Sequence, residues 1–256
     1  MEIIEVRQIS EFRRNTAVEL VVGPDGARID FAGSGAVHPG NLNATPAIVQ
    51  SVTMYVMRLM VAAGLPLNDG LLEPLEIVIP NGLLNPPFVD DPERCPAIVG
   101  GNVETSQRLT DTLLEALKLA GCSQGTMNNF SFGNQRFGYY ETVGGGAGAT
   151  ARRDGAGGVH THMTNTKITD PEVLEHRYPV RLHRFALRRG SGGAGAHRGG
   201  DGLVRFEGIP IFVPRSAPGD RHIRSAGCTG HSPVPGKRRP RAVRPWRPRH
   251  QPRRSR

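Results

Sequence analysis

The chain has 256 residues, of which 38% are hydrophobic and 21% charged, and this suits one or two globular domains with a hydrophobic core. Its apolar stretches are too interrupted to span a bilayer, which excludes a helical membrane protein. The formal net charge is +9, but 13 of the 32 Lys and Arg and only one of the 23 acids lie at residues 215–256. The rest of the chain is mildly acidic, so the basic charge belongs to the C-terminal segment alone.

The first residues and the cysteines favour a cytoplasmic protein. The opening sequence MEIIEVRQIS carries two glutamates and no apolar segment, which is not the pattern of a signal peptide. Cys95, Cys122 and Cys228 are far apart and odd in number, which fits a reducing compartment better than a disulfide framework or a zinc site. We therefore expect a cytoplasmic location without membrane attachment.

Three strands are predicted in the first part of the chain. VELVVG (residues 18–23) and ARIDFAGSG (residues 27–35) alternate apolar and polar residues on either side of a Pro-Asp-Gly turn. This pattern predicts a β-hairpin. LEIVIP (residues 75–80) predicts a buried strand that ends at a Pro-Asn-Gly turn.

Three helices are predicted from capping residues and apolar spacing. The first covers residues 46–63, with Thr45 as N-cap. The second starts at an Asn102 cap and is closed by Gly121. A third, short helix follows the pair Asp170-Pro171. The apolar stripe of the second helix consists of Val103, Leu109, Leu113, Leu114, Leu117 and Leu119.

Two glycine clusters mark the region that follows, VGGGAGA at residues 143–149 and GSGGAGAHRGGDG at 190–202. Such glycines either present backbone amides to a ligand or allow close loop packing, and composition alone favours packing. Neither cluster fits a P-loop or a dinucleotide-binding motif. The predicted fold is therefore a mixed α/β (α+β) incomplete domain over residues 1–213, with a β-hairpin, two main helices and a glycine-rich loop and strand region.

Residues 214–256 form an Arg- and Pro-rich segment, KRRPRAVRPWRPRHQPRRSR at its end, with almost no aliphatic residues. Such a composition cannot bury enough surface to fold, so a disordered tail is predicted. Three interpretations compete: an arm that binds nucleic acid or a membrane surface, a solvated appendage, and an out-of-frame translation of a GC-rich coding region. The abrupt change in composition favours the third.

The densest polar segment is DGAGGVHTHMTNTKITDPE, residues 154–172. His160 and His162 are two residues apart, so on a strand both side chains would project to one face. Histidines placed in this way can bind a metal or transfer protons. The alternative is that each imidazole only forms hydrogen bonds with loop carbonyls, and the sequence favours neither.

Two further segments carry candidate polar groups. Residues 100–111 lie at the predicted start of the second helix, where free backbone amides suit an anion or a polar substrate group. The alternative is a cap whose Glu104 and Gln107 face solvent. In residues 123–146, Asn128 and Glu141 are set among aromatic residues as in a pocket wall. Glu141 is a candidate general acid or base, although such a carboxylate is more often structural.

The motifs GNVETSQR, SQGTMNN, YYETVGGGAGA, GVHTHMTNTKITDPEVLEHRYP and RRGSGGAGAHRGGDGLVR stand in this order. As an ordered set they resemble the C-terminal part of the hydantoinase B / 5-oxoprolinase family. NLNATPAIVQSVTMYVMR and PLNDGLLEPLEIVIPNGLLNP resemble the segment that precedes these motifs in the family. The resemblance covers residues 18–206, and five collinear motifs make it specific.

The resemblance implies a B-type component of a hydrolase that opens cyclic amides such as hydantoins or 5-oxoproline with ATP. A hydantoinase A-type partner subunit would bind the ATP. The resemblance also implies that the N-terminal half of the family's B component, which would carry the ligands of any divalent metal, is missing here. Because this half and an ATP site are both missing, the chain is expected to be a fragment that is inactive alone. Alternatives are a component of a related ATP-dependent ketone carboxylase and, in a different class, a basic-tailed nucleic-acid-binding protein.

The candidate site residues are taken from these motifs. His160, His162 and Glu141 are the predicted catalytic residues, and the metal ligands are unknown. We expect the two histidines to face a cavity with the glycine turn and the start of the second helix, whose backbone amides can stabilise an oxyanion or phosphate. The predicted substrate-binding residues are Asn102, Glu104, Gln107, Asn128, Gly144, Gly145, Gly146 and Asn165.

The composition of residues 214–256 yields a first testable prediction. Backbone amides in this segment are expected to exchange with solvent at unprotected rates, because the segment has no apolar periodicity and a strong positive charge. Hydrogen exchange followed by mass spectrometry measures this directly. Slow exchange and protease resistance across residues 220–256 would contradict a disordered tail.

Overall fold

The structure, a computed structural model, describes residues 2–9, 15–24, 26–61, 64, 66–208 and 223–224, with only the backbone described for 2–9, 15, 208 and 223–224. The predicted tail lies outside the described residues except for that last pair. Its disorder, and a domain boundary at residues 213 and 214, therefore stay predictions. Within the described ranges, no helix is long and apolar enough to cross a membrane.

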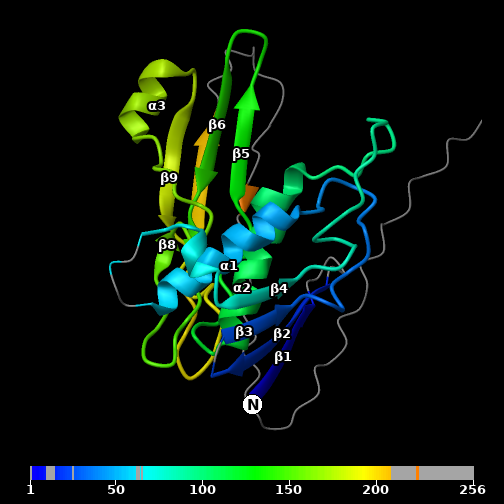
Figure 1. The fold of residues 1–256 in the computed structure, drawn as a ribbon. Coiled ribbons are helices and arrows are strands. Elements are labelled where there is room, and N and C mark those ends of the chain that lie inside the picture. The colour runs from blue at the N-terminus through cyan, green and yellow to red at the C-terminus, as the bar shows by residue number, and fades with distance from the viewer. Residues whose placement is uncertain are drawn as a thin grey trace, which may run out of the picture.

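The N-terminal part of the fold is a four-stranded sheet in the order β1-β2-β3-β4 (Figure 1). β1–β2 and β2–β3 are antiparallel, and β4 adds to β3 in parallel. The predicted hairpin is confirmed, with Gly23 opposite Gly26. The strands are β1 (Glu2–Ile9), β2 (Asn15–Gly23), β3 (Gly26–Asp30) and β4 (Leu75–Val78).

Helices α1 (Pro46–Met60) and α2 (Ser106–Ala116) pack on each other, and α2 also packs on β1 and β2. The predicted start of α1 is confirmed, because Thr45 is its N-cap and the Thr45 side chain accepts a hydrogen bond from the Ile48 amide. The main hydrophobic core lies between these two helices and the sheet. Its fully buried members include Leu20, Ile29, Phe31, Val49, Val52, Leu109 and Leu113.

The predicted cap at Asn102 is wrong. Residues Gly101–Thr105 form one π-helical turn, and α2 continues from it at Ser106. Gly101 is buried against the chain at Asn43, where a Cβ on Gly101 would lie 2.3 Å from the Asn43 carbonyl oxygen. This close approach fixes where the helix begins, and no local capping residue is needed.

The predicted end of α2 at Gly121 is also wrong. The helix ends at Ala116, and Lys118 takes the left-handed conformation (φ 55°) that usually falls to glycine. The amides of Lys118 and Leu119 donate to the carbonyls of Glu115 and Leu114, as in a Schellman motif. Leu119 lies beyond the helix and is 36% exposed, so it is not part of the buried stripe.

The C-terminal part of the described chain contains short sheets and one small helix. An aromatic cluster joins the β5–β6 hairpin to α3, with Tyr139 and Leu174 at its centre. The predicted start of α3 is confirmed, because the Asp170 side chain caps it. The elements are β5 (Asn128–Gly133), β6 (Gly138–Val143), β7 (Gly145–Gly146), β8 (Gly157–Val159), α3 (Pro171–Arg177), β9 (Arg181–Leu187), β10 (Leu203–Gly208) and β11 (Ile223–Arg224).

The two glycine clusters pack against each other through their backbones. A Cβ on Gly146 would lie 2.0 Å from the Gly200 carbonyl oxygen, and the Gly200 amide donates to the Ala147 carbonyl at 2.9 Å. Side chains at these positions would collide with backbone atoms. The described geometry therefore supports close loop packing as the role of these glycines.

Taken together, the described helices and strands form a mixed α/β fold, as predicted.

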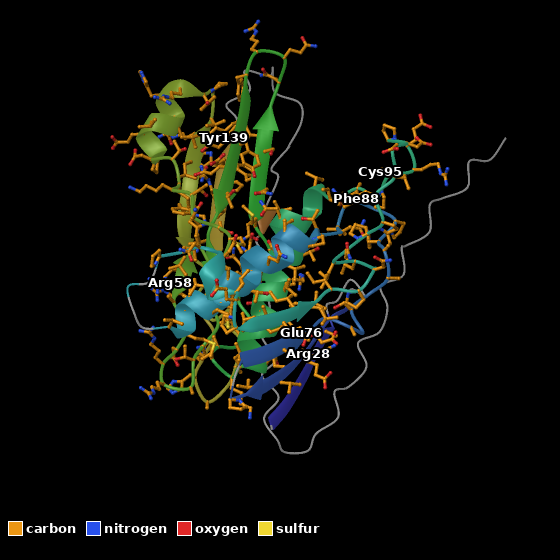
Figure 2. The ribbon with its side chains drawn as sticks, in the orientation of Figure 1. Arg28, Arg58, Glu76, Phe88, Cys95 and Tyr139 are labelled. Atoms are coloured by element: carbon orange, nitrogen blue, oxygen red, sulfur yellow. The ribbon has the colours of Figure 1, made fainter. Side chains whose placement is uncertain are left out.

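The surface carries polar pairs and a projecting loop. Arg28 on β3 forms ion pairs with Asp30 and with Glu76 on β4, both at 2.9 Å. Phe88, which is 51% exposed, and Cys95 lie on the loop between β4 and the π-helical turn (Figure 2).

Candidate functional site

The two candidate histidines lie just after strand β8, which ends at Val159. The chain then makes a tight turn in which the Thr164 amide donates to the Thr161 carbonyl at 3.0 Å. His162 has a left-handed φ of 53° in this turn. No strand extends over the two histidines, so strand alternation does not determine their placement, and a shared face stays a prediction.

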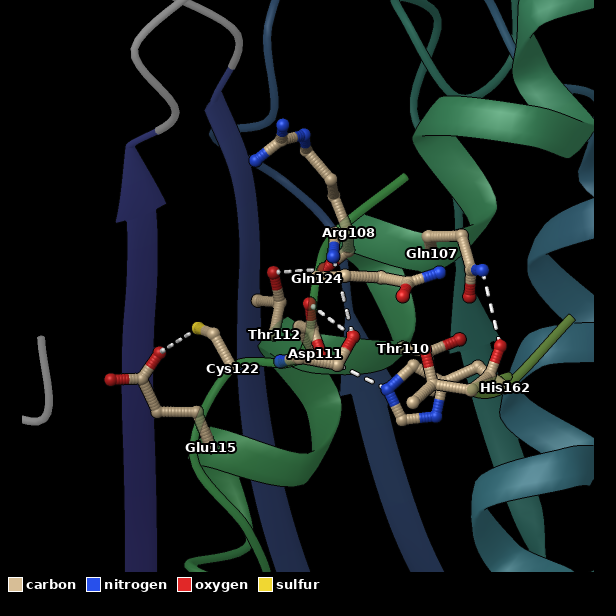
Figure 3. A network of polar contacts seen from close by, with 12 residues as sticks. Gln107, Arg108, Thr110, Asp111, Thr112, Glu115, Cys122, Gln124 and His162 are labelled. Carbon is tan, nitrogen blue, oxygen red and sulfur yellow. Dashed lines mark hydrogen bonds and ion pairs between the residues drawn. The ribbon is translucent and has the colours of Figure 1, made fainter. Parts of the chain in front are cut away.

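His162 is held by α2. Its Nε2 lies 2.9 Å from Asp111 Oδ1, and the two side chains are 11% and 2% exposed (Figure 3). Tyr55 on α1 meets the imidazole edge to face, with ring centroids 6.0 Å apart. The candidate histidine is thus a nearly buried side chain with one fixed polar partner.

Asp111 is the centre of a small polar network on α2. Its Oδ1 also accepts the Ser123 amide at 2.9 Å, and its Oδ2 accepts the Ser123 hydroxyl at 3.3 Å. Such donors compensate the cost of burying a carboxylate. The pKa values of Tyr55 and Glu115 are both raised. Burial is the larger cause, and the negative charge of Asp111 is the second.

Gln107 lies one helical turn before Asp111 and holds the same tight turn. Its amide nitrogen donates to the Thr161 carbonyl at 3.1 Å and to the Thr164 hydroxyl at 2.7 Å. Its carbonyl oxygen accepts the Met163 amide at 3.2 Å. Gln107 is fully buried, so the expectation that it faces solvent is wrong, and both of its amide hydrogens are used inside the protein.

Glu141 lies in a buried ion cluster. Its Oε2 accepts Arg205 Nη1 at 2.6 Å and the Tyr139 hydroxyl at 2.5 Å, and its Oε1 accepts the Thr169 amide at 2.8 Å. Arg205 also binds Glu207 at 2.5 Å, and burial raises the pKa of Glu207. Both carboxylate oxygens of Glu141 are hydrogen-bonded inside the protein. These contacts are those of a structural carboxylate, which was the alternative to a general acid or base.

His160 is half-buried and belongs to a different environment from His162. Burial lowers the pKa of His160, while the charge of Glu141 opposes this shift. Its Nδ1 is buried without a hydrogen-bond partner among the described residues. The imidazole is therefore disposed to be neutral near pH 7, with one ring nitrogen available.

The predicted glycine turn is adjacent to His160. Gly145 pairs with Val159 in the β7–β8 ladder, and a Cβ on Gly144 would lie 3.1 Å from the Val159 backbone. A Cβ on Gly145 would lie 1.8 Å from Gln124 Oε1. The glycines thus let strand β8 and the Gln124 side chain approach closely.

The other predicted substrate-binding residues are spread over the surroundings of the site. Glu104 accepts a hydrogen bond from the Thr126 hydroxyl, and the Asn102 carbonyl accepts the Ser106 hydroxyl at 2.5 Å. The Asn128 side chain donates to the Val143 carbonyl at 3.1 Å, and Asn165 is exposed. None of these contacts joins them to either histidine, so their role as substrate ligands stays a prediction.

Asp111 was not predicted from the sequence. It follows Gln107 at the i, i+4 spacing, which places both on one face of a helix. That face otherwise buries Leu114, so a carboxylate there needs a buried partner. A carboxylate on the apolar side of an amphipathic helix is the feature that could have identified it.

The described residues do not fit a resident metal ion, since no group of three or more His, Cys, Asp or Glu side chains among them is placed to hold one. The contacts His162–Asp111 and His197–Asp154 each bring together only two such groups.

A family model described as Hydantoinase B/oxoprolinase matches residues 5–230. The chain therefore belongs to the hydantoinase B/oxoprolinase family, and the resemblance carried by its motifs is confirmed. The 5-oxoprolinase 1 of Arabidopsis thaliana is 52% identical over 179 residues, which are 70% of this chain and 14% of that protein. A putative D-/L-hydantoinase component of the B type, from Pseudomonas sp. (strain NS671), is 30% identical over 169 residues, 62% of this chain and 27% of that protein.

Two solved structures share the fold. A nucleotide-free acetone carboxylase aligns with a TM-score of 0.64 at 21% identity, covering 81% of this chain and 31% of that chain. An ATP-dependent caprolactamase from Pseudomonas jessenii aligns with a TM-score of 0.61 at 22% identity, covering 80% of this chain and 38% of that chain. At these identities the likeness concerns the fold alone, and this chain corresponds to a minor part of each enzyme.

The ion cluster yields a second testable prediction. Arg205→Met should lower the free energy of unfolding by about 3–5 kcal/mol, because it leaves two like-charged carboxylates buried without their cation. Urea unfolding followed by circular dichroism measures the change. The matched control is Arg28→Met at the exposed pair on β3 and β4, which should change stability little. Equal effects of the two substitutions would contradict a structural role for the cluster.

Proposed function

We propose that this chain is the B-type component, or a part of it, of an ATP-dependent hydrolase that opens cyclic amides such as hydantoins or 5-oxoproline. The observation that carries the proposal is the match to 5-oxoprolinase 1 at 52% identity over 70% of this chain. The solved caprolactamase, described as ATP-dependent, shares the fold and supports the same class of reaction. A cytoplasmic location remains part of this proposal.

The chemistry of the ring supports the assignment of ATP binding and hydrolysis to two different components. An amide carbonyl is a poor electrophile, so its hydrolysis at neutral pH benefits from activation by phosphorylation. The chain has no P-loop, and we assign the binding of ATP to a hydantoinase A-type partner. The Pseudomonas relative is named as one of the subunits of a hydantoinase, which supports an assembly of more than one chain.

The residues of this chain would then handle the proton transfers. Water attacks the activated carbonyl carbon, and a histidine takes its proton. When the ring C–N bond breaks, the nitrogen leaves with a proton returned by a histidinium, and the carbonyl carbon is left as an acyl phosphate. A second water hydrolyses this acyl phosphate to the carboxylate and inorganic phosphate. His162, fixed on Asp111, is the proposed base. His160, which burial keeps neutral, is the proposed second proton carrier. Glu141 is proposed to act through its charge on His160.

A second candidate is a component of a ketone carboxylase. The nucleotide-free acetone carboxylase supports it, because its TM-score of 0.64 is as high as that of the caprolactamase. The two candidates differ in their co-substrate, since a carboxylase requires bicarbonate. ATP turnover that depends on a ketone and bicarbonate, and not on a cyclic amide, would favour the carboxylase.

A chimera provides the third testable prediction. The segment of Arabidopsis 5-oxoprolinase 1 that matches this chain would be replaced by the corresponding residues of this chain. The chimera is expected to hydrolyse 5-oxoproline with ATP, because the exchanged segments are 52% identical. His162→Ala in the chimera should lower kcat by about 10²-fold or more, the usual scale for a positioned acid or base. Release of glutamate and of ADP measures the reaction.

The matched control is His197→Ala in the same chimera. His197 also contacts an aspartate, with its Nδ1 3.1 Å from Asp154 Oδ1, but this pair is exposed in the glycine-rich region. Its removal is expected to leave kcat within a few-fold of the parent chimera. A folded but inactive parent chimera would contradict the proposed function, and full activity of His162→Ala would contradict the proposed role of that histidine.

A further inference from the structure

We propose that Asp111 is a positioning residue that holds His162 in the tautomer with the proton on Nε2, so that Nδ1 is the ring nitrogen that accepts a proton. The inference deepens the proposed function, and its catalytic part rests on that function. Asp111 lies outside the sequence motifs that carry the family resemblance. The basis of the inference is the network around Asp111 in Figure 3.

The direction of the hydrogen bonds follows from the other partners of Asp111. The Ser123 backbone amide can only donate, and it lies 2.9 Å from Asp111 Oδ1. An ionised carboxylate only accepts hydrogen bonds. His162 Nε2 reaches the same Oδ1 at 2.9 Å, so this ring nitrogen must carry the proton when the imidazole is neutral.

The other ring nitrogen remains available. Among the described residues, no hydrogen-bond partner contacts His162 Nδ1, and the side chain retains 11% exposure. A neutral imidazole with its proton on Nε2 has an acceptor lone pair on Nδ1. When Nδ1 takes a proton from water or substrate, the imidazolium formed stays in contact with the Asp111 carboxylate, which stabilises its charge.

The backbone of the turn supports this arrangement. A left-handed φ is uncommon for residues other than glycine, although histidine adopts it more often than most, and it persists where the surroundings hold it. Gln107 supplies three hydrogen bonds to the turn from Thr161 to Thr164. Gln107 and Asp111 thus act from one face of α2, the first on the backbone of the turn and the second on the imidazole.

The tautomer can be measured on the full chain without any enzymatic activity. Long-range ¹H–¹⁵N correlation spectra of the ¹⁵N-labelled protein distinguish protonated from unprotonated ring nitrogens, and His162→Gln identifies the resonances. In the pH range where the His162 ring is neutral, we expect Nε2 to be protonated and Nδ1 unprotonated. A protonated Nδ1, or a rapidly averaged mixture, overturns the proposal.

Two substitutions test whether Asp111 sets the tautomer of His162. Asp111→Ala should replace the single tautomer by an averaged mixture, and in the chimera it should lower kcat by about 10²-fold with little change in KM. Thr112→Val is the matched control, because Thr112 is a buried polar neighbour on α2 whose hydroxyl contacts Thr16 and the Arg108 carbonyl. It should keep the wild-type tautomer and kcat. A single Nε2–H tautomer in Asp111→Ala overturns the proposal.

The outcomes separate this inference from the proposed function. The wild-type spectrum decides the tautomer even if Asp111→Ala does not fold. An Nε2–H tautomer together with an active His162→Ala chimera overturns both the proposed base and the catalytic part of the positioning role. An inactive His162→Ala chimera with the opposite tautomer overturns the positioning role and leaves the proposed function intact.

Discussion

The contact between α2 and the turn at residues 161–164 is the constraint on which the site depends. The turn follows a strand of three residues and lies in a region rich in glycine, so its own sequence does little to fix its conformation. Helix α2 supplies the contacts that fix the conformation of the turn. Gln107 binds the backbone of the turn and Asp111 binds the His162 ring, over sequence distances of more than 50 residues. The helix itself is fixed because its other face is buried in the main core.

A second polar cluster organises the other half of the described fold. Arg205 on β10 neutralises Glu141 on β6 and Glu207 on its own strand, and the rings of Phe130 and Phe185 each lie 5.8 Å from its guanidinium carbon. The cluster joins the β5–β6 hairpin to the β9–β10 sheet, and it lies close enough to His160 to act on its pKa. His162 is therefore held by α2, whereas the ion cluster acts on His160 through the charge of Glu141.

The sequence predicted those features that local residues determine. Thr45 before a proline and Asp170 before a proline each marked a helix start that the structure confirms. The start of α2 was missed because it depends on Gly101 lying against the distant Asn43 carbonyl. Strand alternation does not determine the placement of the histidines, because β8 stops before them. Asp111 escaped prediction for the same physical reason, since its partner is 51 residues away.

Gln107 and Asp111 on α2 fix the turn that carries His162, and the exchange rate of the Met163 amide tests this central claim most directly. This amide donates a hydrogen bond of 3.2 Å to the side-chain oxygen of the buried Gln107. Native-state hydrogen exchange should show Met163 protected to a degree comparable with the buried amides of α2, and Gln107→Ala should remove that protection while α2 stays protected. Exchange of Met163 as fast as that of an exposed loop amide in the wild-type protein would contradict the claim.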